Sequence, residues 1–350
     1  MVVRHSHENS RFSFTVFRVA GRTWAMKHVL PLLAIVFFAL GPAWSAHAAA
    51  SVTNRPVIIF DTDMGSDVDD AGALALLHRL ADLGEVELVG VIFSSGKNRF
   101  GVGVCDAINT WYGRGDLPLG QYQRDDIGDP QNSYSRQIAT ATNIYHHDVI
   151  DRAPDLVRVY KDALRAARDR SVTILTVGHP HGLVWLMRDP EGSGLVKGKV
   201  SRWVAMGGTP EQPGRDWNLG ENGTGAYMDE LLSTWPTEAY FSPFGETVIT
   251  GNRKMPTTPV NNPVREAYRL WNNALEKGRS SWDQVAVLYT ARPHLFEVQR
   301  GTMRHTSGPN VVWDSKAVGS KHYRVLPRIS ESALAEMIED LMVQPPNKGR

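Results

Sequence analysis

The chain has 350 residues, 42% of them hydrophobic, with 38 Lys and Arg against 37 Asp and Glu. This composition suits one large soluble globular domain, and the near-zero net charge gives no indication of a nucleic-acid partner. The single cysteine, Cys105, excludes an internal disulfide framework and a multi-cysteine metal site.

The N-terminal segment has the pattern of a secretory signal peptide. An apolar run at residues 29–44 follows Lys27 and His28, and the A-x-A sequence at residues 46–48 supplies a cleavage site. The run is short for a membrane span. We expect residues 1–48 to be a signal peptide, with residues 1–25 a mis-assigned extension, and residues 49–350 to form the mature domain. The protein is then exported, periplasmic or secreted, without a stable membrane anchor; a retained N-terminus would instead act as an anchor.

The stretch at residues 57–77 predicts a strand, a loop and a helix. Apolar residues at 57–60 lead into the loop, and Ala and Leu follow at helical spacing. Ligands of open α/β sheets bind at the carboxyl ends of the strands. Crowded carboxylates either stay protonated or meet a cation, and their oxygens suit calcium or magnesium. The loop carries five such side chains: Asp61, Asp63, Asp67, Asp69 and Asp70.

Simpler explanations apply to parts of this cluster. Asp69 or Asp70 could serve only as a helix cap, and acidic runs are often solvated loops. An EF-hand is excluded because its sixth and twelfth positions, counted from Asp61, hold Ser66 and Gly72, and because a strand precedes the loop. The role of Asp67 is open.

The rest of the chain alternates apolar strands with helices. Strands are predicted at residues 87–95, 171–178, 201–208 and 238–244, and helices at 103–113, 155–169, 225–235, 262–278, 281–291 and 330–342. Residues 116–150 are polar and irregular, which is typical of a lid or a disordered segment. The alternation predicts a single α/β domain whose mostly parallel central sheet is flanked by helices.

The sequence DTDMGSDVDDA at residues 61–71 resembles the signature of the nucleoside hydrolases, the inosine–uridine-preferring N-ribohydrolases. The family pattern is D-x-D-x-G-x-D-D, usually with Pro where Met64 stands, and this chain has two extra residues before the paired aspartates. The resemblance extends from about residue 56 to residue 344. It implies a Rossmann-like nucleoside-hydrolase fold, bound Ca²⁺, a small nucleoside or riboside substrate, and a homodimer or homotetramer.

The resemblance also implies a metal site. In the family, two aspartates of the signature, a later aspartate and one backbone carbonyl bind calcium. The matching residues are Asp63, Asp70, Asp283 and the carbonyl of Val177. Asp63 matches the base that activates a metal-bound water. Taken alone, Asp283 would be interpreted as a helix cap.

A substrate-binding set follows from the same resemblance. The family's Glu-Phe-Asn triplet, whose Glu and Asn bind ribose hydroxyls, corresponds to residues 216–218, although Asn218 alone could be a turn residue. Trp282 stands where one branch has a His that protonates the leaving base, and its ring can stack on a base. Alternative acids are His146, His147, His179 and His181. The predicted substrate-binding residues are Asp69, Asn98, Met206, Asp216, Asn218 and Trp282.

The predicted function is calcium-dependent hydrolysis of the N-glycosidic bond of a ribonucleoside or similar riboside, through an oxocarbenium-like transition state. Two alternatives stay open. One is a haloacid-dehalogenase-type phosphatase, which also places D-x-D after its first strand and uses Mg²⁺. The other is a calcium-dependent sugar- or nucleoside-binding protein without turnover. The leaving-group pocket is expected at residues 116–150 and 262–282, where the resemblance is weakest.

Overall fold

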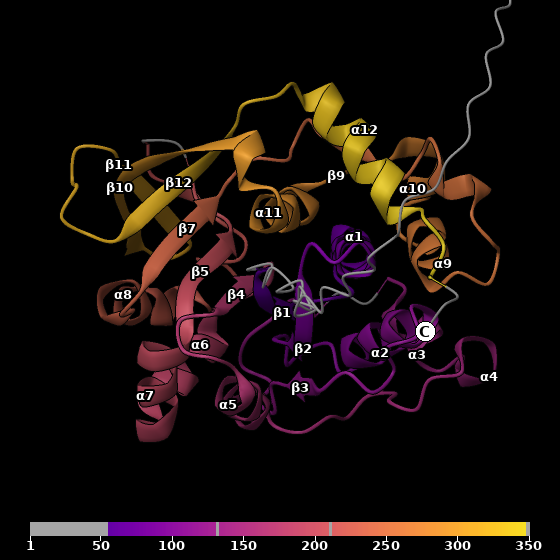
Figure 1. Ribbon diagram of the computed structural model, residues 1–350, viewed down its shortest axis with the longest axis horizontal. Helices are drawn as coiled ribbons and strands as arrows, with labels where there is room; N and C mark the ends of the chain where they lie inside the picture. The colour runs from indigo at the N-terminus through magenta and orange to yellow at the C-terminus, as the bar shows by residue number, and fades with distance from the viewer. Residues whose placement is uncertain (1–54, 131–132, 210–211, 348–350) are drawn as a thin grey trace, which may run out of the picture. The chain divides into compact units, whose positions relative to one another are not determined.

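The computed structural model describes residues 55–130, 133–209 and 212–347 (Figure 1). The predicted signal peptide and its cleavage site lie outside the described residues. Within these ranges, no helix is both long enough and apolar enough to cross a membrane.

In the described part of the chain, a ten-stranded sheet has the order β3-β2-β1-β4-β5-β7-β12-β10-β11-β6. Neighbouring strands are parallel from β3 to β12, and the pairings beyond β12 are antiparallel. This confirms the predicted mostly parallel sheet. The strands are β1 (Val57–Thr62), β2 (Glu87–Phe93), β3 (Leu119–Gln121), β4 (Val172–Thr176), β5 (Val200–Met206), β6 (Gly214–Arg215), β7 (Glu238–Ser242), β10 (Phe296–Ser307), β11 (Asn310–Asp314) and β12 (His322–Pro327), with β8 (Ile249–Thr250) and β9 (Arg279–Ser280) in a separate two-stranded sheet.

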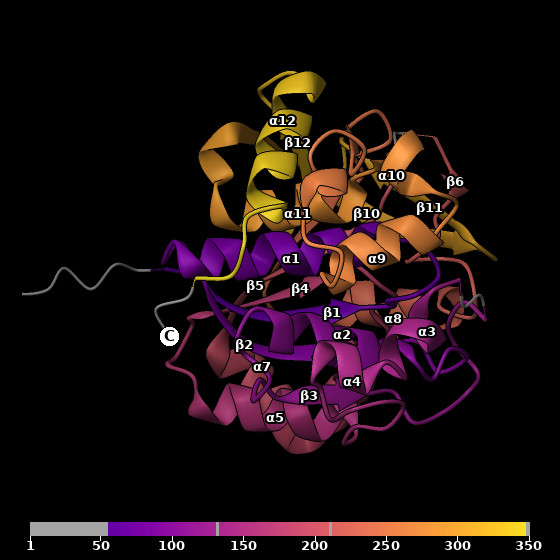
Figure 2. The same ribbon diagram turned by 90° about the vertical axis from the view of Figure 1, so that its right-hand side faces the viewer.

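Helices cover both faces of the sheet (Figures 1 and 2). One face carries α1 (Asp69–Asp82), α2 (Gly101–Trp111), α9 (Pro263–Leu270), α11 (Trp282–Ala291) and α12 (Glu331–Met342). The other carries α5 (Leu156–Ala166), α6 (His181–Arg188), α7 (Pro190–Lys199) and α8 (Gly225–Thr234). Shorter helices are α3 (Ser135–Ala139), α4 (Thr142–Tyr145), α10 (Ala274–Lys277), η1 (Met255–Thr257) and η2 (Pro293–Leu295).

Strand β1 shows why the sequence needs both helical layers. Ile58 and Phe60 belong to the core that includes α1, α2 and α11. Val57 and Ile59 belong to the opposite core, with α5, α6 and α8. Successive side chains of a strand point to opposite faces, so an uninterrupted apolar run is buried only when both faces are covered.

Three regions differ from the sequence-based expectations. Residues 116–150 are not simply a lid or disorder: β3 pairs with β2 at the sheet edge, and α3 and α4 follow. The helix expected over residues 262–278 is broken into α9 and α10, because Asn272 and Asn273 adopt positive φ values of 45° and 54°. Helices α6 and α7 and the antiparallel strands β10–β12 were not predicted.

The strand order contains a topological switch point beside β1. From β1 the chain proceeds to β2 and β3 on one side, and later to β4 and β5 on the other. In open α/β sheets the crevice outside the carboxyl ends of the strands at such a point is the usual ligand site. The acidic loop predicted from the sequence begins there, directly after β1.

Candidate active site

Backbone contacts from both neighbouring strands hold the start of the acidic loop. The N–H of Val177, just after β4, donates to the carbonyl of Asp61 at 2.7 Å, and Ser94, just after β2, donates to the carbonyl of Thr62 at 2.9 Å. A side chain at position 178 would collide with the backbone nitrogen of Asp63, so Gly178 is required for this close approach. Asp63 is therefore fixed at the end of the sheet.

The predicted metal ligands meet at a small cavity of about 10 Å³. This is room on the order of one water molecule. Its wall contains all four residues of the predicted calcium set. Asp63 and Val177 directly follow β1 and β4, while Asp70 lies in α1 and Asp283 in α11. The lining residues are Asp63, Ser66, Asp67, Asp70, Val177, Met206, Trp217, Asn218 and Asp283.

The carboxyl groups of Asp63, Asp70 and Asp283, named here the acidic triad, are buried and repel one another. Burial first, and then neighbouring aspartates, raise the pKa of each well above its usual value. Among the described residues, Oδ2 of Asp63 and Oδ1 of Asp283 are buried without a hydrogen-bond partner. Orphaned carboxylate oxygens around a small cavity are a donor set that fits a hard divalent cation such as calcium.

The side chains of the predicted metal ligands do not converge on one point as they would around a bound ion. In the ranges that the structure describes, no three His, Cys, Asp or Glu side chains converge closely enough to hold a metal. Two ligand groups instead bond to the protein: the Thr62 hydroxyl donates to Asp70, and Nδ2 of Asn218 donates to the carbonyl of Val177 at 2.6 Å.

A larger pocket of about 480 Å³ adjoins this cavity. The two share part of their walls, at Ser66, Asp67, Met206 and Trp217. Three tryptophans line the larger pocket: Trp217, Trp271 and Trp282. A small acidic cavity that continues into an aromatic pocket is the shape expected for a ligand with a polar sugar and a planar group.

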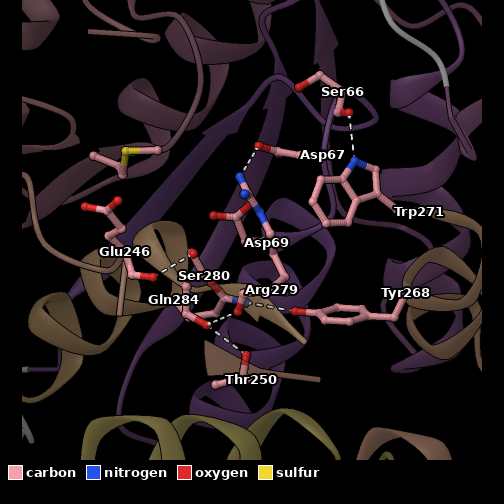
Figure 3. Close-up of polar contacts among 12 residues, drawn as sticks. Ser66, Asp67, Asp69, Glu246, Thr250, Tyr268, Trp271, Arg279, Ser280 and Gln284 are labelled. Carbon is pink, nitrogen blue, oxygen red and sulfur yellow. Dashed lines mark hydrogen bonds and ion pairs between the residues drawn. The ribbon is translucent and has the colours of Figure 1, made fainter. Parts of the chain in front are cut away.

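Two other acids of the loop have a cation of their own. Arg279, in β9, donates from Nη2 to Asp67 at 2.5 Å and from Nε to Asp69 at 3.1 Å (Figure 3). We call Asp67 and Asp69 the arginine-bound pair. Burial, and after it the charge of Asp67, raise the pKa of Asp69 to about 7, although Arg279 acts to lower it. The guanidinium lies over the rings of Trp271 and Trp282, at 4.8 and 4.7 Å from the ring centres.

The remaining predicted substrate residues occupy varied positions. Both carboxylate oxygens of Asp216 accept backbone N–H groups, from Leu219 at 2.7 Å and Gly208 at 2.6 Å, although Asp216 also lines the larger pocket. Asn98 is buried, accepts the Ser135 hydroxyl and donates to the Met64 carbonyl. It is not among the described residues that line either cavity. Sugar-binding roles for these residues stay predictions.

The candidate histidine acids lie away from the larger pocket. Nε2 of His179 is 3.3 Å from Oδ2 of Asp63, and burial lowers the pKa of His179 to about 4, so its ring is neutral. His181 is buried against Tyr122. His146 and His147 line a separate cavity. Within the described residues, no histidine lines the pocket that holds Trp282.

Solved structures share this architecture. An inosine-uridine preferring nucleoside hydrolase from Bacillus anthracis matches with a TM-score of 0.63 and 15% identity, over 82% of this chain and 99% of its own. A plant nucleoside hydrolase matches at 0.62 and 13%, over 83% and 99%. The protein has the nucleoside hydrolase fold.

A solved structure that is not named as a nucleoside hydrolase also shares this fold. The type III effector protein XopQ, solved with adenosine diphosphate ribose, matches with a TM-score of 0.56 and 14% identity, over 83% of this chain and 93% of its own. No protein-family model matches the sequence, and neither does any curated protein.

Sequence reasoning missed two residues of the site in this nucleoside hydrolase fold. Arg279 lies in a two-residue strand far from the acidic loop in sequence, and no motif marks it. Trp271 follows α9, and its indole N–H donates to the carbonyl of Ser66 at 3.1 Å (Figure 3). Both contact the loop segment that contains the two extra residues. The one feature of the sequence that could have indicated Arg279 is its position, four residues before Asp283.

Proposed function

We propose that the protein is a calcium-dependent N-glycosidase that hydrolyses a ribonucleoside or a similar riboside. One observation carries the proposal: the cavity lined by Asp63, Asp70, Asp283 and Val177 shares a wall with a pocket lined by three tryptophans. Sugar and leaving group can then occupy the two spaces at once. The nucleoside hydrolase fold supports this reading, since members named in the structural matches act on nucleosides.

The acidic triad and the carbonyl of Val177 would hold the calcium ion. Bound there, the ion would supply positive charge that balances the carboxylates and lowers the pKa of a water molecule. Asp63, whose Oδ2 has no hydrogen-bond partner among the described residues, is the group placed to accept a proton from that water. Asn218 keeps the Val177 carbonyl oriented through its 2.6 Å hydrogen bond.

Asn218, in the wall of the small cavity, and Asp69, next to Asp70 in the chain, would hold the sugar. Asn218 and Asp69 are the proposed partners of the ribose hydroxyls, and their contacts accelerate the reaction only if they strengthen as the ring flattens. Trp282 and its neighbouring tryptophans surround the planar leaving group. Bulk water is then excluded from the leaving-group side of the bond that breaks.

The test is a panel of nucleosides assayed for free reducing sugar, with and without EDTA. We expect release of sugar that EDTA abolishes and added calcium restores. Sugar release that is insensitive to EDTA contradicts the calcium role, and release of phosphate from p-nitrophenyl phosphate would support the phosphatase alternative.

A second candidate is a calcium-dependent riboside-binding protein without turnover. The observation that favours it is the engagement of Asp69, a proposed sugar ligand, by Arg279. The match to an effector protein solved with adenosine diphosphate ribose also favours it. Thermal stabilisation by ribose, without hydrolysis of inosine or uridine, would support this candidate over the enzyme.

We further propose that the protein is exported after cleavage near Ala49. The support is the basic, apolar and A-x-A pattern of residues 27–48. N-terminal sequencing and the intact mass of the exported protein test it. A mature chain that begins near residue 49 is the expected result, whereas a retained N-terminus indicates a membrane anchor.

A further inference from the structure

Of the residues that the structure describes, Arg279 is the one largely buried cationic side chain in the wall of the larger pocket. Among the described residues, the larger pocket has two cationic side chains in its wall, Arg279 and Arg215. Arg215 pairs with Glu221, and its side chain is 73% exposed. The side chain of Arg279 is only 18% exposed and is fixed from four directions, by Asp67, Asp69, Trp271 and Trp282.

This fixation leaves part of the guanidinium available. Nε bonds to Asp69 and Nη2 bonds to Asp67, and no described residue accepts a hydrogen bond from Nη1. A guanidinium carries five N–H donors in one plane, so two bonds do not exhaust it. Arg279 lines the pocket beside Trp282, so its remaining N–H groups can donate to a ligand there.

Among the described residues, the pocket also lacks a histidine, the side chain that most often serves as a general acid near neutral pH. The described residues that line it include no His, Lys, Cys or Tyr. It has three carboxyl groups, each already engaged within the protein: Asp67 accepts from Arg279, Asp216 accepts two backbone N–H groups, and Asp129 is buried with an interaction of its own. Arg279 itself keeps its proton, because guanidinium groups are not deprotonated in proteins. It can stabilise negative charge but cannot act as a general acid.

We infer that Arg279 stabilises the departing leaving group by a hydrogen bond from its guanidinium, in place of proton transfer from a general acid. The inference rests on the proposed glycosidase function. As the bond from the anomeric carbon breaks, its electron pair moves to the leaving group. The oxygen of water bonds to that carbon, and Asp63 accepts the proton. The leaving group accepts a hydrogen bond from Arg279 and takes its proton from solvent after release.

This hydrogen bond can lower the reaction barrier because its donor is already held in position before the reaction. A donor held rigidly where charge develops needs no reorganisation during the reaction, and removing one such donor typically lowers the rate about 10²- to 10³-fold. The benefit depends on how much charge the leaving group carries. A poor leaving group such as hypoxanthine or uracil needs the donor, whereas 4-nitrophenolate carries its charge without help.

The experiment compares kcat/KM for inosine and uridine with kcat/KM for 4-nitrophenyl β-D-ribofuranoside. For Arg279→Met we expect a loss of about 10²- to 10³-fold on the nucleosides and of less than about tenfold on the nitrophenyl riboside. Arg279→Lys keeps a positive charge near the two aspartates but not the fork, so we expect the same pattern with a smaller loss. If the Met variant fails to fold, the Lys variant alone carries the comparison.

Arg188 provides a matched control outside the pocket. It also lies over two aromatic rings, Trp185 and Tyr227, and pairs with Glu230. Arg188→Met should change both substrates by less than about twofold, as expected for an exposed ion pair. An equal loss on all substrates in the Arg279 variants shows a purely structural role and overturns the inference. A wild-type protein that cleaves neither substrate class contradicts the proposed function itself.

Discussion

The acidic loop and Asp283 divide into two sets of buried acids that differ in how their charge is balanced. The arginine-bound pair, Asp67 and Asp69, has Arg279 from the chain itself. Among the described residues, the acidic triad has no cationic side chain in the wall of its cavity, and two of its oxygens lack a hydrogen-bond partner. Burial without a counter-charge is costly for a carboxylate. The chain therefore balances the charge of one set itself, and the proposed calcium ion would balance the charge of the other.

The largest expected effect is on catalysis by the triad. Asp63→Ala should lower kcat at least about a thousandfold, because it removes the proposed base and one metal ligand together. The measurement is steady-state hydrolysis of the best nucleoside, together with the bound calcium content. Asp125→Ala, a change at an exposed loop aspartate, is the control and should leave kcat within about twofold. Near-normal turnover of the Asp63 variant with calcium still bound would rule out this assignment.

The next effect concerns stability of the arginine-bound pair. Arg279→Met should lower the free energy of unfolding by about 3 kcal/mol, since removing one partner leaves buried charge uncompensated. Arg188→Met, which breaks an exposed pair, should cost less than about 1 kcal/mol. Both are measured by urea unfolding in calcium-saturated buffer.

A second substitution tests the cause of that loss. Asp69→Asn in the Arg279→Met background removes one of the two uncompensated charges, so the double variant should regain part of the lost stability. Two results would show that charge balance is not the reason. One is an equal loss in free energy of unfolding for Arg279→Met and Arg188→Met. The other is a double variant whose loss exceeds the sum of the losses of its two single variants.

Calcium affinity should separate the two sets directly. We expect Asp283→Asn to raise the Kd for calcium at least about a hundredfold, because the loss of a residue that merely supports a ligand already costs about 10- to 100-fold. Asp69→Asn should raise it less than about tenfold, since Asp69 bonds to Arg279. Isothermal titration with calcium measures both. A larger increase in Kd for the Asp69 variant than for the Asp283 variant would show that the arginine-bound pair, and not the acidic triad, binds calcium.

The sequence predicted the parts of this comparison that depend on local pattern. An apolar run followed by clustered aspartates placed the site after β1, and the structure brings distant Val177 and Asp283 to the same cavity. The arginine-bound pair was not predictable. Its formation depends on Arg279 in β9 crossing to a loop about 210 residues earlier, and on the break after α9 that brings Trp271 to Ser66. Such contacts follow from tertiary packing, which no local periodicity reports.

The same limit explains the errors in the fold. Strand β3 has only three residues, and its existence depends on its parallel pairing with Val91, Ile92 and Phe93 of β2. The residues before it are polar, so the segment resembles a loop. Strand β10 alternates buried and exposed positions imperfectly, and its pairing with β12 and β11 defines it.

The smallest expected effect is a pH dependence of the chelated protein. Burial and mutual repulsion raise the pKa of each triad acid in the folded state. The folded protein then binds more protons than the unfolded chain, so its stability falls as pH rises through those pKa values. In EDTA we expect the free energy of unfolding to be lower at pH 8.5 than at pH 7.0, measured by urea unfolding. This range stays above the ordinary titration of the buried histidines, whose pKa values burial lowers.

Saturating calcium should abolish this dependence, because it replaces protons as the positive charge among the triad oxygens. The double variant Asp63→Asn, Asp283→Asn should show a smaller dependence in EDTA, since two of the three triad acids with raised pKa values are gone. The arginine-bound pair offers the contrast: Asp67→Asn leaves the triad intact and should retain the pH dependence. If the chelated protein instead gains stability as pH rises, the triad acids are ionised and compensated within the chain, and the difference between the two sets of acids disappears.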